Sequence, residues 1–146
     1  MDLVNKLWGF CHTLRHEGVD YSDYIEELTY LLFLKIADEK EIAIPKGCDW
    51  LTLTQYEGED LLRKYNSVLL ELSNQKGILK DLFREPIAKI RNSTSLKKLL
   101  NLIDEINWSE YNEDVLGSTF EGLLEKAAND ALFLHLLPIK SMIEFG

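Results

Sequence analysis

The stretch Tyr21–Glu41, YSDYIEELTYLLFLKIADEKE, decides the fold of this chain. Ser22 near its start is a residue type that caps helices, and the acidic side chains that follow suit the positive end of a helix dipole. The run Leu28–Ala37 holds only two polar residues, Thr29 and Lys35. A helix that is apolar almost all round lies in the middle of a bundle, and this run is too short to cross a bilayer, which needs roughly 20 residues. We therefore predict a buried central helix that other helices cover.

The composition is that of a globular protein of one domain, with 146 residues of which 46% are apolar. The formal net charge of −9 opposes binding to nucleic acid or to a membrane surface by the chain on its own, because like charges repel over long range. Cys11 and Cys48 are a widely spaced pair, which favours reduced thiols in a cytoplasmic protein over a disulfide framework. No basic region followed by an apolar run opens the sequence, so we expect no signal peptide.

Apolar residues at helical spacing predict further helices around the central one. The first spans about residues 2–17 and ends before Gly18, and the third spans about residues 59–74. Between the central and third helices we expect a loop in which Trp50 plugs the core and Leu51 and Leu53 pack beside it.

The second half of the chain continues the helical pattern. A short fourth helix of one or two turns covers residues 78–83. Ser93 or Ser95 can cap a fifth helix that Trp108 closes, and a sixth begins near Asp114. Successive strands would show an alternation of period two, which is absent. We predict an all-α fold, a compact bundle of about five to six helices around the buried central helix.

Charge is distributed unevenly along the chain. Residues 1–75 and residues 99–146 each carry a net charge of −7, whereas residues 76–98, the basic island, hold seven basic and two acidic side chains, a net of +5. Lys97 and Lys98 fall in the first turn of the predicted fifth helix, where the helix dipole disfavours a cation, so these two lysines point to an anionic partner. A solvated face that balances the acidic blocks is the other open interpretation. The basic residues are Lys76, Lys80, Arg84, Lys89, Arg91, Lys97 and Lys98.

No residue pattern in the sequence marks an active site. His12 and His16 are four positions apart and share one face of the first helix, but Thr13 stands where the zinc-protease motif has the Glu that activates water. Surface or half-buried histidines are therefore the favoured interpretation. Gly-x-Gly, Gly-Lys-Ser/Thr and Gly-x-Ser-x-Gly do not occur. We predict no catalytic, cofactor-binding or metal-binding residue in this sequence.

Two stretches resemble a known family. LWGFCHTLRHEGVDYSDYIEELTYLLFLKIADE (Leu7–Glu39) is similar to the N-terminal helical domain of the modification subunit of type I restriction-modification systems. INWSEYNEDVLGSTFEGLLEKAANDA (Ile106–Ala131) is similar to the end of that domain, where an Asp-x-Leu-Gly-x-x-Phe/Tyr-Glu segment leads into the catalytic domain. The spacing between the two stretches also fits, and the resemblance covers roughly Leu3–Asp130.

The resemblance implies a subunit of a DNA methyltransferase that moves a methyl group from S-adenosylmethionine to N6 of adenine. In the family, two modification subunits work with one specificity subunit. The helical domain would help to assemble this complex and to clamp double-stranded DNA, because chemistry on a base requires flipping it out of the stack. The basic island then supplies candidates for DNA-backbone contacts. The alternative is a helical protein–protein interaction module without a nucleic-acid role, which the net charge of −9 suits.

After Asp130 the sequence departs from the family. The Gly-Gln-aromatic-Thr-Pro segment of the cofactor site is expected soon after this residue, but the chain reads ALFLHLLPIKSMIEFG (Ala131–Gly146), and the catalytic Asn/Asp-Pro-Pro-Tyr/Phe motif is missing too. We therefore divide the chain into a helical domain, residues 1–130, and an apolar tail, residues 131–146, of an excised domain or a truncated gene product. We expect that the chain alone neither binds S-adenosylmethionine nor methylates DNA, and that deleting the tail leaves the fold intact.

Overall fold

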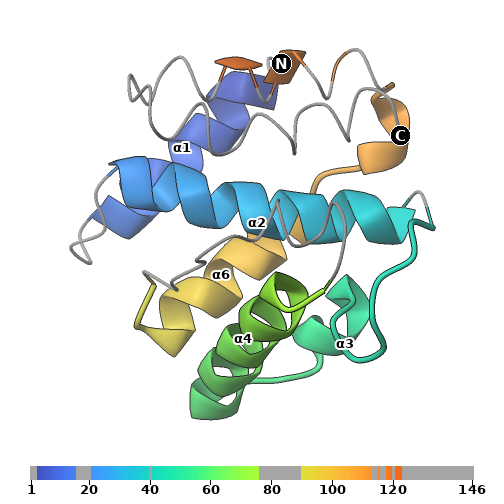
Figure 1. Cartoon of the computed structure of the whole chain (residues 1–146). Helices are drawn as coiled ribbons and strands as arrows, with labels where there is room; N and C mark the ends of the chain where they lie inside the picture. The colour runs from blue at the N-terminus through green and yellow to red at the C-terminus, as the bar shows by residue number, and fades with distance from the viewer. Residues whose placement is uncertain are drawn as a thin grey trace.

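The computed structural model describes residues 3–15, 21–39, 41–75, 90–112, 115, 118–119 and 121–122. No strand occurs among these residues, and the predicted all-α fold is confirmed (Figure 1). The elements are the helices α1 (Leu3–Arg15), α2 (Tyr21–Glu39), α3 (Trp50–Thr54), α4 (Gly58–Ser73) and α6 (Ser93–Asp104), and the 3-10 turn η1 (Trp108–Glu110).

α2 runs through the middle of the described structure (Figure 1). α1 crosses its N-terminal part, and α3, α4 and α6 lie below it in the view. The five consecutive residues Tyr30–Leu34 are all buried, as are Leu28, Ile36 and Ala37. Because a helical turn takes 3.6 residues, five buried positions in a row cover the whole circumference of the helix. The prediction of a buried central helix is confirmed, and α2 ends at Glu39, just before the predicted end.

Two buried hydrogen bonds connect α2 to its neighbours in addition to apolar packing. The hydroxyl of Tyr24 donates to the carbonyl oxygen of Leu7 at 2.9 Å, which joins α2 to α1. The hydroxyl of Tyr65 on α4 donates to the carboxylate of Glu27, which is fully buried in α2. Buried polar groups are costly without partners, so these bonds favour one arrangement of the helices over others.

α4 and α6 pack against each other through one apolar face each. The buried positions recur at intervals of three and four, as expected for helices that bury a single stripe. The predicted helix over residues 59–74 is therefore confirmed as α4. The buried residues are Leu61, Tyr65, Val68, Leu69 and Leu72 on α4, and Ser95, Leu96, Leu99, Leu100 and Ile103 on α6.

The segment around Trp50 is a short helix, α3, and not the loop that we predicted. Asp49 caps it, because its carboxylate accepts hydrogen bonds from the backbone N of Thr52 at 3.2 Å and from the Thr52 hydroxyl at 2.7 Å. Trp50 and Leu53 are buried as predicted. Leu51 is 62% exposed, so its predicted role as a packing anchor is wrong. In a helix, residues 50 and 53 share a face and residue 51 points elsewhere.

The start of α6 also differs from the prediction. Its cap is Asn92, whose side-chain oxygen accepts from the backbone N of Thr94 at 2.8 Å and of Ser95 at 3.1 Å, so neither Ser93 nor Ser95 is the cap. An Asn directly before the first helical residue satisfies two of the N–H groups that a helix leaves open. At the other end, α6 ends at Asp104, earlier than predicted, and Trp108 in η1 closes the helix through a side-chain contact.

The closing contact is a hydrogen bond from Nε1 of Trp108 to the carbonyl oxygen of Ile103 at 2.9 Å. The predicted turns over residues 78–83, most of the predicted sixth helix and the tail, residues 131–146, lie outside the described residues. Within the range of the sixth helix, residues 115, 118–119 and 121–122 are helical. Among the described helices, none is long and apolar enough to span a membrane.

Candidate functional site

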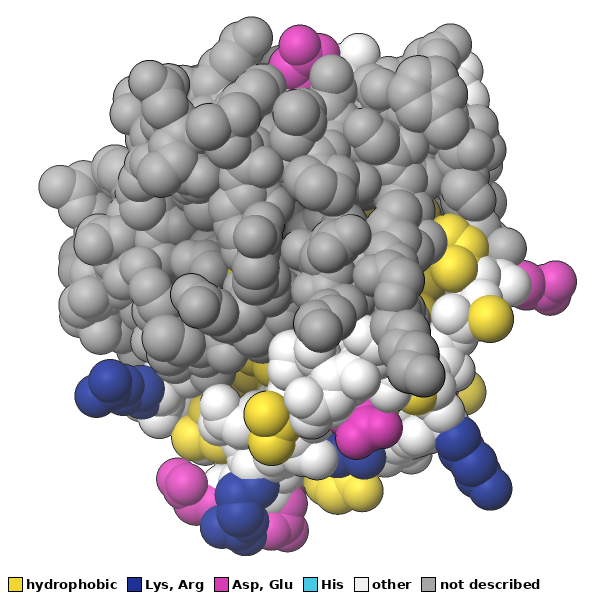
Figure 2. All heavy atoms as spheres, in the orientation of Figure 1, with side chains coloured by type: hydrophobic (Ala, Val, Ile, Leu, Met, Phe, Trp, Pro, Cys, Tyr) yellow, Lys and Arg dark blue, Asp and Glu magenta, His cyan; other side chains and the backbone are white. Residues whose placement is uncertain are grey.

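The structure describes three basic residues of the basic island, all at or near the start of α6. Arg91 and Lys98 are exposed, and Lys97 is partly buried. Figure 2 shows Lys and Arg side chains interleaved with Asp and Glu along the lower edge of the molecule, the part in which Figure 1 places α4 and α6. The other candidates, Lys76, Lys80, Arg84 and Lys89, lie outside the described residues.

Lys97 makes internal contacts that the sequence did not indicate. Its Nζ donates to the carbonyl oxygens of Thr54 at 2.8 Å and of Tyr56 at 3.2 Å. These carbonyls lie at the end of α3 and just beyond it, where open carbonyl groups and the negative end of the dipole favour a cation. The position of this lysine therefore has an explanation within the fold, and its contact with DNA stays a prediction.

Lys97 and Lys98 also lie later in their helix than predicted. Because α6 begins at Ser93, both lysines fall in its second turn. The helix dipole acts mainly on the first turn. The dipole of α6 therefore disfavours these two lysines less than the sequence indicated, and the fold does not require an anionic partner for them.

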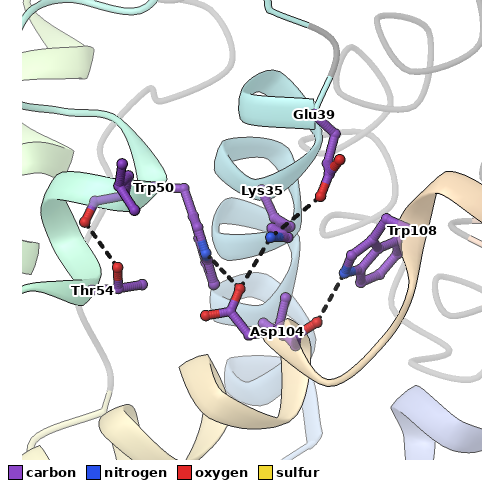
Figure 3. Close-up of polar contacts among 8 residues, drawn as sticks. Lys35, Glu39, Trp50, Thr54, Asp104 and Trp108 are labelled. Carbon is purple, nitrogen blue, oxygen red and sulfur yellow. Dashed lines mark hydrogen bonds and ion pairs between the residues drawn. The ribbon is translucent and has the colours of Figure 1, made fainter.

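Asp104 holds the other end of α3 (Figure 3). Its Oδ1 accepts a hydrogen bond from Nε1 of Trp50 at 2.9 Å and lies 3.0 Å from Nζ of Lys35. The same ammonium lies 3.4 Å from Oε1 of Glu39 and 5.7 Å from the centre of the Trp50 ring, a distance typical of cation–π contacts. One carboxylate oxygen thus joins α2, α3 and α6.

Lys97 and Asp104 together form what we call the α3 clasp. Trp50 begins α3 and contacts the last residue of α6, whereas Thr54 ends α3 and contacts the second turn of α6. The two helices therefore run in opposite directions. Lys97 and Asp104 are seven positions apart, or about 10.5 Å along a helix. This separation suits contacts with both ends of a helix as short as α3.

Lys35 is a charged group of the fold rather than a group that exchanges protons near neutral pH. Burial by itself lowers the pKa of Lys35, but the hydrogen bond and the charge of Asp104, with a further contribution from Glu39, outweigh it and raise the pKa above its ordinary value. The ammonium therefore stays charged at neutral pH, and its charge is paired.

A hollow of about 390 Å³, which we call the α4–α6 hollow, opens where α4 and α6 begin. Glu57 and Gly58 form one wall of it. The residues that line the hollow carry two ammonium groups, two hydroxyls and an amide against one carboxylate, and the donors among these groups suit an oxyanion. The lining residues from α6 are Ser93, Thr94, Lys97, Lys98 and Asn101.

Metal ligands and nucleophiles are the other groups from which a site could be built. Among them, no group of three or more His, Cys, Asp or Glu side chains is placed to hold a metal ion. The side chains of Cys11, His12 and His16 are outside the described set. Cys48 is a buried free thiol, and burial together with the negative charge of Glu71 raises its pKa. A neutral thiol is a poor nucleophile, so Cys48 belongs to the core.

Sequence reasoning missed Asp104 and Glu27 as organising residues, because on a helical pattern both look like solvated acids. Lys35 was the one feature of the sequence that could have indicated a role for an acidic residue such as Asp104. A lysine inside an apolar run must find an acidic partner when the run is buried, since an unpaired buried charge is very costly. For Glu27, nothing in the local pattern distinguished it from Glu26 beside it.

Comparison with known proteins identifies the relatives of the chain. Residues 3–43 match the HsdM N-terminal domain. The chain is 35% identical over 137 residues to the methylase subunit of the type I restriction enzyme StySJI of Salmonella typhimurium (strain LT2). It is 34% identical over 139 residues to the methylase subunit of the type I restriction enzyme EcoKI of Escherichia coli (strain K12).

Both alignments cover 88% of this chain and 26% of the relative, so the chain spans about a quarter of the length of these relatives. The similarity confirms the resemblance that the stretches Leu7–Glu39 and Ile106–Ala131 carry.

Proposed function

We propose that the chain is a non-catalytic helical domain of a type I restriction enzyme methylase subunit, because its residues 3–43 match the HsdM N-terminal domain. It has two tasks in this proposal. One is docking onto the specificity subunit and a second methylase subunit, and the other is holding double-stranded DNA in the assembled complex. Similarity to methylase subunits over 88% of the chain is the observation that supports this proposal most.

The chemistry of the complex lies with the full-length subunit in this proposal. There, S-adenosylmethionine supplies the methyl group and N6 of adenine accepts it, in the cytoplasm where the DNA is. A base that is methylated must leave the stack, which costs a few kcal/mol of unstacking and unpairing. A domain that holds the duplex while one base is extruded therefore has a clear physical purpose.

The exposed charges at the start of α6 support the contact with DNA. Arg91 and Lys98 are both exposed, and long cationic side chains of this kind reach phosphate oxygens without reading bases. We include Lys76, Lys80, Arg84, Lys89 and Lys97 among the backbone candidates on the basis of the sequence. The acidic remainder of the chain repels DNA, so the partner subunits must orient the basic island toward it.

Assembly is tested by co-purifying the chain with the specificity subunit of its own restriction enzyme. We expect a stable complex that survives gel filtration. The Leu70→Ala variant is the comparison. Leu70 is 64% exposed on α4, so the variant should fold like wild type and shows whether this surface takes part in the complex. No complex with the specificity subunit, in the presence or absence of a full methylase subunit, would contradict the assembly role.

The DNA contact is tested on the assembled complex through the salt dependence of DNA affinity. Replacing Arg91 and Lys98 together by Ala should flatten the slope of log affinity against log salt by up to about 1.8, or about 0.9 for each lost phosphate contact. Site preference should not change, because phosphates look alike at every step. Lys97→Ala belongs in a separate measurement, since it also removes the hydrogen bonds to the end of α3.

The matched control for this measurement replaces Lys6 on α1 and Lys46 in the loop before α3, both exposed. An equal change of slope in the control and in the double variant of Arg91 and Lys98 would return the basic island to the solvated-face interpretation. A further outcome is a complex that assembles normally and has the same DNA affinity in both variants and in wild type. This result would favour the alternative, a protein–protein interaction module, which the net charge of −9 suits.

A further inference from the structure

The α4–α6 hollow gathers side chains that bind oxyanions. Lys97 and Lys98 lie three and four positions beyond Thr94, and Asn101 lies seven positions beyond it, so the four residues share one face of α6, and all four line the hollow. We infer that the hollow binds a phosphate oxyanion. If the proposed function holds, this phosphate belongs to a DNA backbone. A free phosphate ion has the same chemistry and is the other source of the ligand.

Lys97 is already oriented for this task. An ammonium group has three N–H donors, and two of those on Lys97 go to the carbonyl oxygens of Thr54 and Tyr56. The third donor is available to a ligand in the hollow that the same side chain lines. A lysine held in place by the fold loses less conformational freedom on binding than one that is free in solvent.

Side chains, and not the backbone of α6, form the recognising groups. The side-chain oxygen of Asn92 accepts from the backbone N of Thr94 and of Ser95, which occupies two of the N–H groups at the start of the helix. The ligand therefore meets the ammonium groups of Lys97 and Lys98, with hydroxyl and amide groups beside them. Charge-assisted hydrogen bonds are about twice as strong as neutral ones, so the lysines dominate the affinity.

Glu57 opposes an oxyanion from the other wall of the hollow. Its carboxylate lines the hollow, and its side chain makes no capping hydrogen bond to α4. Binding of a single free phosphate is therefore weak, whereas a backbone phosphate gains from neighbouring contacts on the same strand. The repulsion by Glu57 also provides a variant with an increased affinity for phosphate, because Glu57→Gln removes the negative charge and keeps a side chain of the same size.

The experiment titrates inorganic phosphate into the isotope-labelled chain while chloride keeps the ionic strength constant, and follows backbone amide signals by NMR. We expect saturable shifts at Gly58, Ser93, Thr94 and Asn101, and at Tyr56, because the ligand and this residue share the ammonium of Lys97. Lys98→Ala should weaken phosphate binding about two- to fivefold, and Glu57→Gln should strengthen it by a similar factor.

Lys6→Ala removes one exposed charge on α1 and should leave phosphate binding unchanged. Equal weakening by Lys6→Ala and Lys98→Ala, or shifts that chloride alone reproduces, would overturn the inference in favour of general charge screening. An unchanged affinity in Glu57→Gln together with shifts outside the hollow would place the phosphate elsewhere and overturn it as well.

A second arm separates the hollow from the proposed function. A duplex DNA of mixed sequence is added to the assembled complex containing the Lys98→Ala or Glu57→Gln chain. Opposite changes of DNA affinity in the two variants identify a backbone phosphate as the ligand. Phosphate binding by the isolated chain with no change in DNA affinity keeps the oxyanion site and contradicts the DNA contact. Altered DNA affinity without phosphate binding by the chain supports the DNA contact and overturns the preformed site.

Discussion

Asp104 shows how one side chain connects three helices. It is the last residue of α6, where the negative end of the helix dipole disfavours a carboxylate. Its partners offset this cost, since the indole of Trp50 and the ammonium of Lys35 both contact Oδ1. The Lys35 side chain is only 12% exposed, so removing Asp104 leaves a largely buried cation whose remaining ion-pair partner among the described residues is Glu39.

We predict that Asp104→Ala lowers the free energy of unfolding by about 1–3 kcal/mol, the cost of leaving buried donors without an acceptor. Asp104→Asn should cost less, because an amide oxygen still accepts from Trp50 but offers no charge to Lys35. Urea denaturation followed by tryptophan fluorescence measures both values. The control is Glu105→Ala at the exposed neighbouring position, and an equal loss in Asp104→Ala and this control would show that the contacts to Asp104 contribute nothing.

Asp49 makes the stability of the chain depend on pH. The hydrogen bond from the Thr52 side chain, with the backbone N–H of Thr52 adding to it, lowers the pKa of Asp49 below 3.8 in spite of partial burial. A carboxyl whose pKa is lowered by folding stabilises the fold above its unfolded pKa, and this contribution is lost as the pH falls through the folded pKa.

We therefore predict that wild type is more stable than Asp49→Asn at pH 5 and above, and that the difference shrinks as the pH falls below about 3.8. Asn still caps helices, so the comparison isolates the charge from the cap. Urea denaturation of both proteins in steps from pH 7 downward gives the difference at each pH. A difference that stays constant through the acid range would contradict the prediction.

At the scale of the element, α2 and α3 are stabilised in different ways. The length and the apolar composition of α2 make it a helix that must be buried. α3 has only five residues, and isolated helices shorter than about 12 residues are marginal in water. It therefore depends on Asp49 at its start and on the α3 clasp, Lys97 and Asp104, from the neighbouring helix.

We predict that Leu32→Asp unfolds the chain, because Leu32 is 1% exposed and an unpaired carboxylate there costs about 4 kcal/mol or more. Leu70→Asp is the matched control, since Leu70 is 64% exposed on α4. Thermal unfolding followed by circular dichroism should show a cooperative transition near that of wild type for the control only. A similar transition for Leu32→Asp would mean that α2 is not the centre of the bundle.

We also predict that Lys97→Ala lowers the free energy of unfolding by about 1–2 kcal/mol, whereas Lys98→Ala changes it by less than about 0.5 kcal/mol. The two lysines are adjacent, but the carbonyl groups at the end of α3 bond only to Lys97 among the described lysines. Urea denaturation distinguishes the two variants. Equal effects would mean that the α3 clasp does not depend on Lys97.

At the scale of the whole molecule, charge separates what the chain does alone from what it does in a complex. The net charge is −9, and the basic island is flanked by two acidic blocks. Screening shortens these interactions to about 8 Å at physiological salt, so only groups close to the DNA count. The chain alone must approach DNA with acidic surface nearby, whereas partner subunits can fix its orientation.

We predict that the isolated chain binds duplex DNA too weakly to detect at physiological ionic strength. At low salt we expect tighter binding only if the basic island is the surface that contacts the DNA. Fluorescence anisotropy with a labelled duplex across a salt series tests this. The Arg91→Ala and Lys98→Ala double variant is the comparison at low salt. Tight binding by the isolated chain at physiological salt would contradict the need for partners.

The sequence by itself determined the fold class and the position of the central helix, because these depend on local periodicity. The apolar run from Leu28 to Ala37 and the stripes of α4 and α6 are visible without knowledge of any contact. The resemblance carried by Leu7–Glu39 was also readable, and the relatives confirm it. These inferences hold because burial at intervals of three and four is a property of one helix alone.

Only the tertiary structure decided the roles of particular polar residues. The bonds of Lys97 to Thr54 and of Asp104 to Trp50 join positions 43 and 54 residues apart, and no local pattern encodes such distances. The α4–α6 hollow likewise exists only because the starts of two helices meet. Periodicity predicts which face of a helix is buried, but not which neighbouring helix that face contacts. The polar partners of a residue depend on that neighbouring helix.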